Sequence, residues 1–406
     1  MSFNTINYEL SASSLSAMNL ELSAGQFFKK LAWYPPAETK IPLRAILSAL
    51  LSKSSNFEKT LCIYLKVEKC VLGNSGRSLL SSLLEILKQR DNDERNEVLI
   101  PGYTCYSVAA SVARAGLKIR TYDLDPLSLE PDLDSVTQAA GEETLAIIIQ
   151  HLFGIPTPVN RIQEIGKDVG AYLIEDAAQA LGGTMNGRPL GTAADFGFYS
   201  FGRGKPLPLG GGGAMVGKDL DTLSNLRRVG DGKGYVQLSS TLITPFMSLP
   251  FCYWIPEMLP LGLGETIFDP NFNVSGMPLV MQNLAENTIA SLDDLNLHRR
   301  RVAGIYNETF DDDFIFLVPD DASPIYTRFP AKASTGTIPK DLKRLGVRRM
   351  YPKAIPDVDT IKPYLADPQS NTPGALEIAR NLITLPTHMG ITENLAKEIA
   401  HKVKVG

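Results

Sequence analysis

A single lysine, Lys205, lies in the stretch FYSFGRGKPLPLGGGGAMV (198–216), between a glycine and a proline and shortly before four consecutive glycines. Glycine and proline mark loops, and a lysine in a loop is commonly only a solvated charge. A phosphate-binding P-loop is a second interpretation. It fails, because its first glycine would fall on Tyr199 and because Pro206 stands where a serine or threonine must meet magnesium. If Lys205 reacts, it therefore does so through other chemistry.

Two further features could act together with this lysine. The sequence IEDAAQALGG ends a strand-like run at Glu175 and Asp176, where an acid can also simply cap a helix. The turn NSGRS precedes a leucine-rich segment, so its backbone N–H groups could cap that helix or hold a phosphate. An acid, a phosphate cradle and a lysine together suit pyridoxal phosphate. Its aldehyde needs an amine, its pyridinium nitrogen needs a carboxylate, and its phosphate needs hydrogen-bond donors.

The segments that must position these residues alternate between strand and helix patterns. After NSGRS, one helical face is predicted by the spacing of Leu79, Leu80, Leu83, Leu84 and Leu87. Strand-like runs then occur at EVLIPGY, LKIRTYDLD, LAIIIQHLFG and AYLIEDAAQA, with helical or turn-rich pieces between them. This alternation predicts βαβ units and a mainly parallel sheet covered on both faces. Ligands of such sheets bind at the carboxyl ends of the strands, where several of these polar residues fall.

The chain is predicted to divide into three parts: an N-terminal extension of unassigned role (1–70) packing on the large domain, a large cofactor-binding domain (71–250), and a crossover segment with a smaller C-terminal domain (251–406). The segment 241–264 is strongly apolar but contains four prolines. Each proline would leave a helix in lipid with unsatisfied backbone groups, so a membrane-spanning helix is not expected. A buried connection or pocket wall is favoured over an interfacial or partner-binding patch.

Composition excludes several classes of protein. The 406 residues are 44% hydrophobic and 21% charged, which predicts a globular protein of about two domains. A net charge of -4 with interspersed signs gives no reason to expect nucleic acid or an anionic membrane as a partner. The N-terminus lacks the pattern of a secretory signal, and four scattered cysteines suit a reducing cytoplasm. Four dispersed histidines show no metal-ligand spacing, so we expect structural roles for them and no metal site.

The motifs SGRS, HLFG, EDAAQA and YSFGRGK followed by a glycine run, in this order, resemble the DegT-type sugar aminotransferase family of pyridoxal phosphate enzymes, which has the aspartate aminotransferase fold. The likeness runs from about Val71 to the C-terminus and includes LDDLNLHRRRVAGIY and NLITLPTHMGIT. It implies fold type I: a large α/β domain with a mainly parallel sheet between helices, and a smaller α+β C-terminal domain. It also implies pyridoxal 5'-phosphate as the cofactor.

The resemblance assigns roles residue by residue. Lys205 matches the lysine that forms a Schiff base, the internal aldimine, with the cofactor. Asp176 matches the carboxylate that faces the pyridinium nitrogen and keeps it protonated. The other implied cofactor contacts are Gln179 near the ring hydroxyl, Ala178 on one ring face, the Ser200 hydroxyl at the phosphate, and N–H donors of Gly76 and Arg77.

Three positions depart from the family pattern. The aromatic residue that usually stacks on the ring would fall on Cys105, so we expect the next residue, Tyr106, to stack instead. The glycine run 210–213 lacks the glutamate that the family commonly carries there. For the asparagine that the neighbouring subunit contributes, Asn271 and Asn273 are the candidates.

The resemblance implies an aminotransferase that moves an amino group from an amino acid, glutamate or glutamine, to a keto group of a nucleotide-linked sugar. It also implies a homodimer with shared active sites. Another carbonyl acceptor is an alternative, because the segment 241–264 and the loops are altered. A dehydratase of the same fold carries histidine in place of the lysine, and Lys205 argues against it. A non-catalytic, cofactor-binding regulator of the same fold is the alternative from another class.

Overall fold

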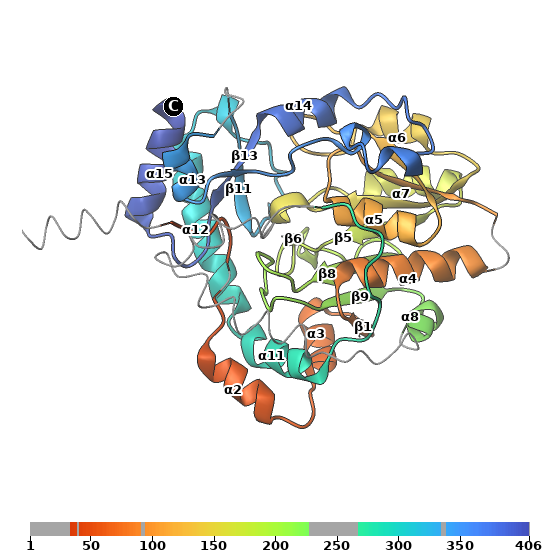
Figure 1. Ribbon diagram of the computed structural model, residues 1–406, viewed down its shortest axis with the longest axis horizontal. Helices are drawn as coiled ribbons and strands as arrows, with labels where there is room; N and C mark the ends of the chain where they lie inside the picture. Colours follow the sequence, from red (N-terminus) through yellow and green to blue (C-terminus); the bar gives the residue numbers. More distant parts are fainter. Residues whose placement is uncertain (1–32, 39, 91–93, 227–266, 334–337, 406) are drawn as a thin grey trace, which may run out of the picture.

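The computed structural model describes residues 33–38, 40–90, 94–226, 267–333 and 338–405 (Figure 1). Within this part of the chain, strands and helices alternate from β1 to β5, as the sequence pattern predicts, and the strands β5 to β9 then follow one another before α8. None of the helices described there combines the length and the apolar character that a membrane span requires.

A seven-stranded sheet with the order β1-β9-β8-β5-β4-β2-β3 forms the centre of the structure. Its strands are β1 (Cys70–Gly73), β2 (Glu97–Pro101), β3 (Lys118–Tyr122), β4 (Thr144–Gln150), β5 (Tyr172–Asp176), β8 (Phe196–Ser200) and β9 (Gly213–Gly217). The pairs from β3 through β2, β4 and β5 to β8 are parallel, whereas β9 pairs antiparallel with β8 and β1. The mainly parallel sheet is confirmed. Register pairs Gln150 with Asp176 and Asp176 with Phe198, so three strand ends lie side by side.

Helices and turns connect these strands. They are α4 (Gly76–Gln89), α5 (Tyr106–Arg114), α6 (Leu133–Ala139), η2 (Leu152–Gly154), α7 (Asn160–Asp168) and α8 (Leu220–Leu226). All five leucines predicted to form one face of a helix are buried in α4, so that prediction is confirmed. Strand β4 is buried along its whole length, as a strand covered on both faces must be.

The C-terminal part builds an antiparallel sheet with the order β11-β13-β12, against which α12 packs (Figure 1). Its elements are α12 (Leu292–Thr309), η3 (Asp312–Phe314), β11 (Arg328–Lys332), α13 (Lys340–Arg344), β12 (Arg348–Arg349), η4 (Ile355–Asp357), η5 (Lys362–Tyr364), α14 (Pro373–Asn381), β13 (Leu382–Pro386) and α15 (Glu393–Val405). A third sheet joins β10 (Ala322–Ser323), β6 (Thr184–Met185) and β7 (Arg188–Pro189).

Two helices precede the central sheet, α2 (Leu43–Leu51) and α3 (Phe57–Leu65), and both pack against α11 (Leu279–Ile289). Their buried side chains share one hydrophobic core with Leu207 and Leu209, just after Lys205. The helices α2 and α3 therefore belong to the hydrophobic core on which the loop of Lys205 packs. The predicted boundary at 250/251 and the apolar segment 241–264 lie outside the described residues.

Candidate active site

A cavity of about 230 Å³ lies at the carboxyl ends of β4, β5 and β8, beside the first turn of α4. Seven of the ten predicted site residues line it: Gly76, Arg77, Asp176, Ala178, Gln179, Ser200 and Lys205. They come from three separate segments of the sequence. The fold brings them together because parallel strands present their carboxyl ends at the same edge of a sheet.

The first turn of α4 forms one wall of the cavity. Ser75 caps this helix: its Oγ accepts a hydrogen bond from the Ser78 N–H, and the Ser78 Oγ accepts one from the Ser75 N–H, both at 3.2 Å. The next two N–H groups, of Gly76 and Arg77, have no acceptor within the helix and point from its positive end. Ser200 is adjacent, because a methyl group on Gly76 would lie 3.4 Å from its Cβ. This arrangement can hold a phosphate group.

Asp176 ends β5, and its side chain lines the cavity while remaining buried. Its Oδ1 accepts a hydrogen bond from the Ala178 N–H at 3.0 Å. Burial raises the pKa of Asp176, and the Lys205 cation and the Ala178 N–H offset only part of that rise. A buried carboxylate of this kind is stabilised by a cationic hydrogen-bond donor, and a pyridinium N–H is such a donor.

The HLFG motif, whose last three residues form the turn η2, bonds to both Asp176 and Gln179. The His151 N–H donates to the Asp176 carbonyl oxygen at 3.0 Å, and the Phe153 N–H donates to Gln179 Oε1 at 2.7 Å. The turn depends on Gly154, whose φ is +80°. A side chain on Gly154 would also come within 2.7 Å of the Gln179 carbonyl oxygen. The motif therefore sets the positions of two residues in the cavity wall.

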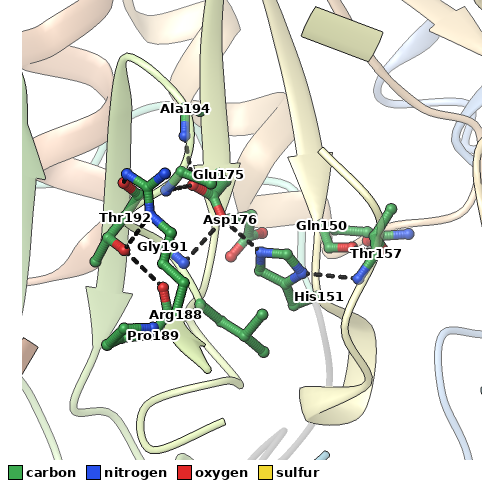
Figure 2. Close-up of polar contacts among 12 residues, drawn as sticks. Gln150, His151, Thr157, Glu175, Asp176, Arg188, Pro189, Gly191, Thr192 and Ala194 are labelled. Atoms are coloured by element: carbon green, nitrogen blue, oxygen red, sulfur yellow. Dashed lines mark hydrogen bonds and ion pairs between the residues drawn. The ribbon is translucent and has the colours of Figure 1, made fainter. Parts of the chain in front are cut away.

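Glu175, the neighbour of Asp176 on β5, is fully buried in a separate hydrogen-bond network (Figure 2). Its carboxylate accepts backbone N–H bonds at 2.6 to 2.9 Å from Gly191, Ala193 and Ala194. His151 Nε2 lies 2.9 Å from Glu175 Oε2, and His151 Nδ1 accepts a bond from the Thr157 N–H at 3.1 Å. His151 is therefore a neutral imidazole that carries its proton on Nε2. Burial raises the pKa of Glu175, but the His151 bond and the backbone N–H groups outweigh it, so this pKa is lowered.

The loop that carries Lys205 is held on both sides by distant parts of the chain. The Gly204 N–H donates to the carbonyl oxygen of Glu38 at 3.2 Å. Arg299 Nη2 donates to the carbonyl oxygen of Pro206 at 3.1 Å. Gly204 has a φ of +69°, a conformation that glycine adopts without strain. The backbone on either side of the lysine is thus fixed while its side chain lines the cavity.

The side chains of Glu38 and Arg299 belong to a buried polar cluster that also contains His388. The Glu38 carboxylate accepts the Met389 N–H at 2.9 Å, and His388 Nε2 donates to the carbonyl oxygen of Pro35 at 2.8 Å. Burial lowers the pKa of Arg299 to about 10, so its guanidinium stays charged at neutral pH. Burial also lowers the pKa of His388 to about 4, so that imidazole is neutral. This cluster joins the N-terminal segment to the lysine loop and to the C-terminal part of the chain.

Tyr106, expected to stack on the cofactor ring, lies outside the cavity lining. Its hydroxyl donates to the carbonyl oxygen of Lys353 and accepts from the Lys353 N–H, both at 3.0 Å. The cavity wall at the start of α5 is formed by Cys105 and Ser107 instead. Successive side chains at the start of a helix point about 100° apart, so neighbouring residues face different surroundings. The aromatic hydroxyl that reaches the cavity belongs to Tyr351, a residue that no local motif indicated.

Asn271 and Asn273 also lie outside the lining of this chain's cavity. The Asn271 N–H bonds the carboxylate of Asp269, and the Asn273 carbonyl oxygen accepts a bond from Asn74 Nδ2 at 2.9 Å. Between them, the ring centroid of Phe272 lies 4.7 Å from the Arg77 guanidinium. The two asparagines therefore run beside the first turn of α4 without entering the cavity.

The donor set of the cavity fits pyridoxal phosphate, the cofactor that the sequence resemblance implies. The helix start at Gly76 and Arg77, with the Ser200 hydroxyl, supplies donors for the phosphate. Asp176 supplies a buried carboxylate for the ring nitrogen, and Lys205 supplies an amine for the aldehyde. The phosphate, the ring nitrogen and the aldehyde of the cofactor thus each have a chemically suitable partner in one cavity.

Fold and site define the class as fold type I, and comparisons with solved structures support this. The sugar aminotransferase CalS13 from Micromonospora echinospora superposes with a TM-score of 0.72 at 20% identity, covering 92% of this chain and 99% of that one. The PLP-form of the sugar aminotransferase Spr1654 from Streptococcus pneumoniae has a TM-score of 0.69 at 21% identity, covering 91% and 98%. At these identities the likeness shows the fold.

The family model that matches is the DegT/DnrJ/EryC1/StrS aminotransferase family, over residues 47–242. These residues, just under half of the chain, contain all the motifs of the cavity and resemble that family. The family predicted from the sequence is thereby confirmed.

Three curated relatives match over shorter segments. A pleiotropic regulatory protein of Geobacillus stearothermophilus is 38% identical over 33% of this chain and 36% of its own length. The dTDP-4-dehydro-2,3,6-trideoxy-D-glucose 4-aminotransferase of Saccharopolyspora spinosa is 30% identical over 44% and 46%. The L-glutamine:2-deoxy-scyllo-inosose aminotransferase of Streptomyces kanamyceticus is 32% identical over 44% and 40%. The matched segments span less than half the length of each relative.

Proposed function

We propose that this chain is a pyridoxal phosphate-dependent aminotransferase that moves an amino group from glutamate or glutamine to a keto group of a nucleotide-linked sugar. One observation carries the proposal: Lys205 and the buried carboxylate of Asp176 line one cavity, together with the start of α4. The name of the Saccharopolyspora spinosa relative, an aminotransferase of a dTDP-linked keto sugar, supports the reaction class. The glutamine-dependent relative supports the donor.

The residues act by binding, orienting and moving protons. When bound, pyridoxal phosphate supplies an aldehyde that can exchange amines and a ring that withdraws electrons. The N–H groups of Gly76 and Arg77 would bind the phosphate, and the Asp176 carboxylate would keep the ring nitrogen protonated. The Lys205 amine would hold the aldehyde of the cofactor, and the free amine would accept and return the proton at the alpha carbon of the amino donor. The Glu38 and Arg299 contacts hold the backbone on both sides of this lysine.

The buried neighbours of Asp176 keep that carboxylate in place. The His151 N–H bonds its backbone oxygen, and the His151 side chain is fixed by Glu175 and Thr157 (Figure 2). Because these groups sit in the low-dielectric interior, they need no rearrangement when charge develops in the cavity. We infer that His151 positions the site and does not itself transfer protons, since both of its ring nitrogens are already bonded.

The proposal is tested with purified protein reconstituted with pyridoxal phosphate. Glutamate or glutamine alone should convert the cofactor absorbance to that of the pyridoxamine form, and addition of the correct acceptor should reverse the change. The acceptor screen should contain keto-sugar nucleotides and 2-deoxy-scyllo-inosose, the acceptor named for one relative. If only 2-deoxy-scyllo-inosose reverses the change, the acceptor is another carbonyl compound and not a nucleotide-linked sugar. No conversion by any amino donor would contradict the aminotransferase function.

A non-catalytic regulator that binds the cofactor is the second candidate. It is favoured by the names of two relatives, a pleiotropic regulatory protein and a sensory transduction protein for erythromycin biosynthesis. A regulator of this kind would bind pyridoxal phosphate at Lys205 but leave it in the aldehyde form when amino donors are added. The same spectra therefore separate the two functions.

We further propose a homodimer in which the partner completes each site through the segment that carries Asn271 and Asn273. Neither residue lines the cavity of its own chain, although the segment lies beside α4. If sites are shared, mixing inactive Lys205→Ala chains with inactive Asn273→Ala chains should restore part of the activity, because one hybrid site has neither substitution. A monomer by light scattering with full activity would contradict the proposal. The cytoplasmic setting stays a prediction from cysteine usage.

A further inference from the structure

Tyr351 brings a phenol hydroxyl into the cavity from the C-terminal part of the chain. It lies between β12 and η4, is about 1% exposed, and lines the same cavity as Asp176 and Lys205. Its hydroxyl oxygen lies 3.3 Å from Gln179 Nε2.

The segment that carries Tyr351 is fixed by Tyr106, the first residue of α5, and by Tyr103 in the turn before that helix. The Tyr103 hydroxyl donates to the carbonyl oxygen of Met350, and the Tyr106 hydroxyl bonds both the N–H and the carbonyl oxygen of Lys353. The Tyr351 ring also packs against both, with centroid distances of 5.7 Å to Tyr103 and 6.1 Å to Tyr106. These contacts leave the Tyr351 ring little freedom to leave the cavity wall.

Hydrogen-bond directions at Gln179 determine what the Tyr351 hydroxyl can do. Gln179 Oε1 already accepts the Phe153 N–H, so Gln179 Nε2 must be the atom that donates to the Tyr351 oxygen. The phenol proton is then left for another acceptor. The neighbouring Cys105 sulfur is a weak acceptor, and an oxygen ligand in the cavity is a better one. Burial, with the Cys105 and Asp176 groups nearby, raises the pKa of Tyr351 well above its usual value, so this proton is retained.

The position beside Asp176 identifies the ligand atom. In pyridoxal phosphate the ring oxygen is bonded to the second carbon from the ring nitrogen. Asp176 is the proposed partner of that nitrogen, so a donor close to Asp176 can reach the ring oxygen. We propose that the Tyr351 hydroxyl donates a hydrogen bond to the ring oxygen of bound pyridoxal phosphate, with Gln179 setting the direction of the hydroxyl. This inference rests on the proposed function, because it requires the cofactor in the cavity.

The test is a pH titration of the absorbance of bound pyridoxal phosphate in the Tyr351→Phe variant. A hydrogen-bond donor to the ring oxygen stabilises the negative charge on that oxygen. It therefore lowers the pKa of the nitrogen that links the cofactor to the lysine. Removal of the donor should raise the midpoint of this titration by about 1 pH unit, the effect of losing one hydrogen bond to a charged oxygen. The affinity for pyridoxal phosphate, measured by equilibrium dialysis, should fall about 3- to 10-fold.

Tyr106→Phe is the matched control, because it removes a hydroxyl that anchors the same segment through Lys353 but does not line the cavity. Its titration midpoint should equal that of the unmutated protein. If Tyr351→Phe leaves the midpoint unchanged, or if both variants shift it equally, the inference is overturned and the proposed function stands. If the unmutated protein shows no absorbance of bound cofactor, the proposed function fails and this inference falls with it.

Discussion

Replacing Glu175 with glutamine should destabilise the protein strongly although the change adds or removes no bulk. The carboxylate is about 1% exposed and accepts four hydrogen bonds, three from backbone N–H groups and one from His151. A glutamine amide has only one acceptor oxygen, so its NH₂ group must face two of these four N–H donors. Those two donors then have no acceptor. Each buried donor left without a partner costs about 1–3 kcal/mol, so two such donors predict a total loss of about 2–6 kcal/mol.

The loss is measured as the change in free energy of unfolding, from urea titrations followed by circular dichroism. Glu97→Gln is the control, because Glu97 makes the same kind of carboxylate contacts with one partly exposed partner, Arg120. That variant should lose about 1 kcal/mol or less. A loss below about 1 kcal/mol for Glu175→Gln, or equal losses for both variants, would refute the reasoning.

The same carboxylate predicts a pH dependence. The pKa of Glu175 is lowered in the folded protein, so its ionised form stabilises the fold at pH values above the ordinary glutamate value of about 4.3. This stabilisation should disappear as the pH falls from about 4.3 through the lower folded-state value. Urea midpoints between pH 6 and pH 3 should therefore fall more steeply for the unmutated protein than for Glu175→Gln, and parallel curves would contradict the assignment.

Three further substitutions probe the cavity. Asp176→Asn removes the charge at the ring nitrogen, and single-turnover kinetics should show amino transfer at least about 100-fold slower, with near-normal rates contradicting the assignment. Gly76→Ala would bring a methyl group within 3.1 Å of the Tyr199 carbonyl oxygen beside the phosphate site, and fluorescence titration should show cofactor affinity about 10-fold lower. Gly141→Ala, which meets no atom within 4 Å, should bind normally. Arg299→Met removes a buried cation beside Glu38 and should cost about 3 kcal/mol in urea unfolding, and an unchanged midpoint would show that the cluster does not hold the lysine loop.

Local sequence patterns correctly predicted the residues that lie at strand ends and at helix starts. Alternating strands and helices predicted a parallel sheet, and such a sheet brings Asp176 and Ser200 to the same edge. The turn at Gly76 and the loop at Lys205 could be assigned because glycine is typical of turns and loops. These are properties of short segments, so one sequence contains enough information to recognise them.

The remaining contacts join segments far apart in the chain, and no local pattern records them. Tyr106 follows Cys105 directly, yet the start of α5 turns the tyrosine towards Lys353 and the cysteine into the cavity. Tyr351 reaches the cavity because the C-terminal segment folds back over α5. His151, expected to be structural, is indeed bonded at both ring nitrogens, but it also lines the cavity.

The link between Lys205 and the cofactor is the central claim, and it can be measured directly. Protein incubated with pyridoxal phosphate is reduced with borohydride, digested and analysed by peptide mass spectrometry. A phosphopyridoxyl group should be found on the peptide that carries Lys205, and the label should be lost in the Lys205→Ala variant. A label on another lysine such as Lys218, or no label on any peptide, would contradict the account.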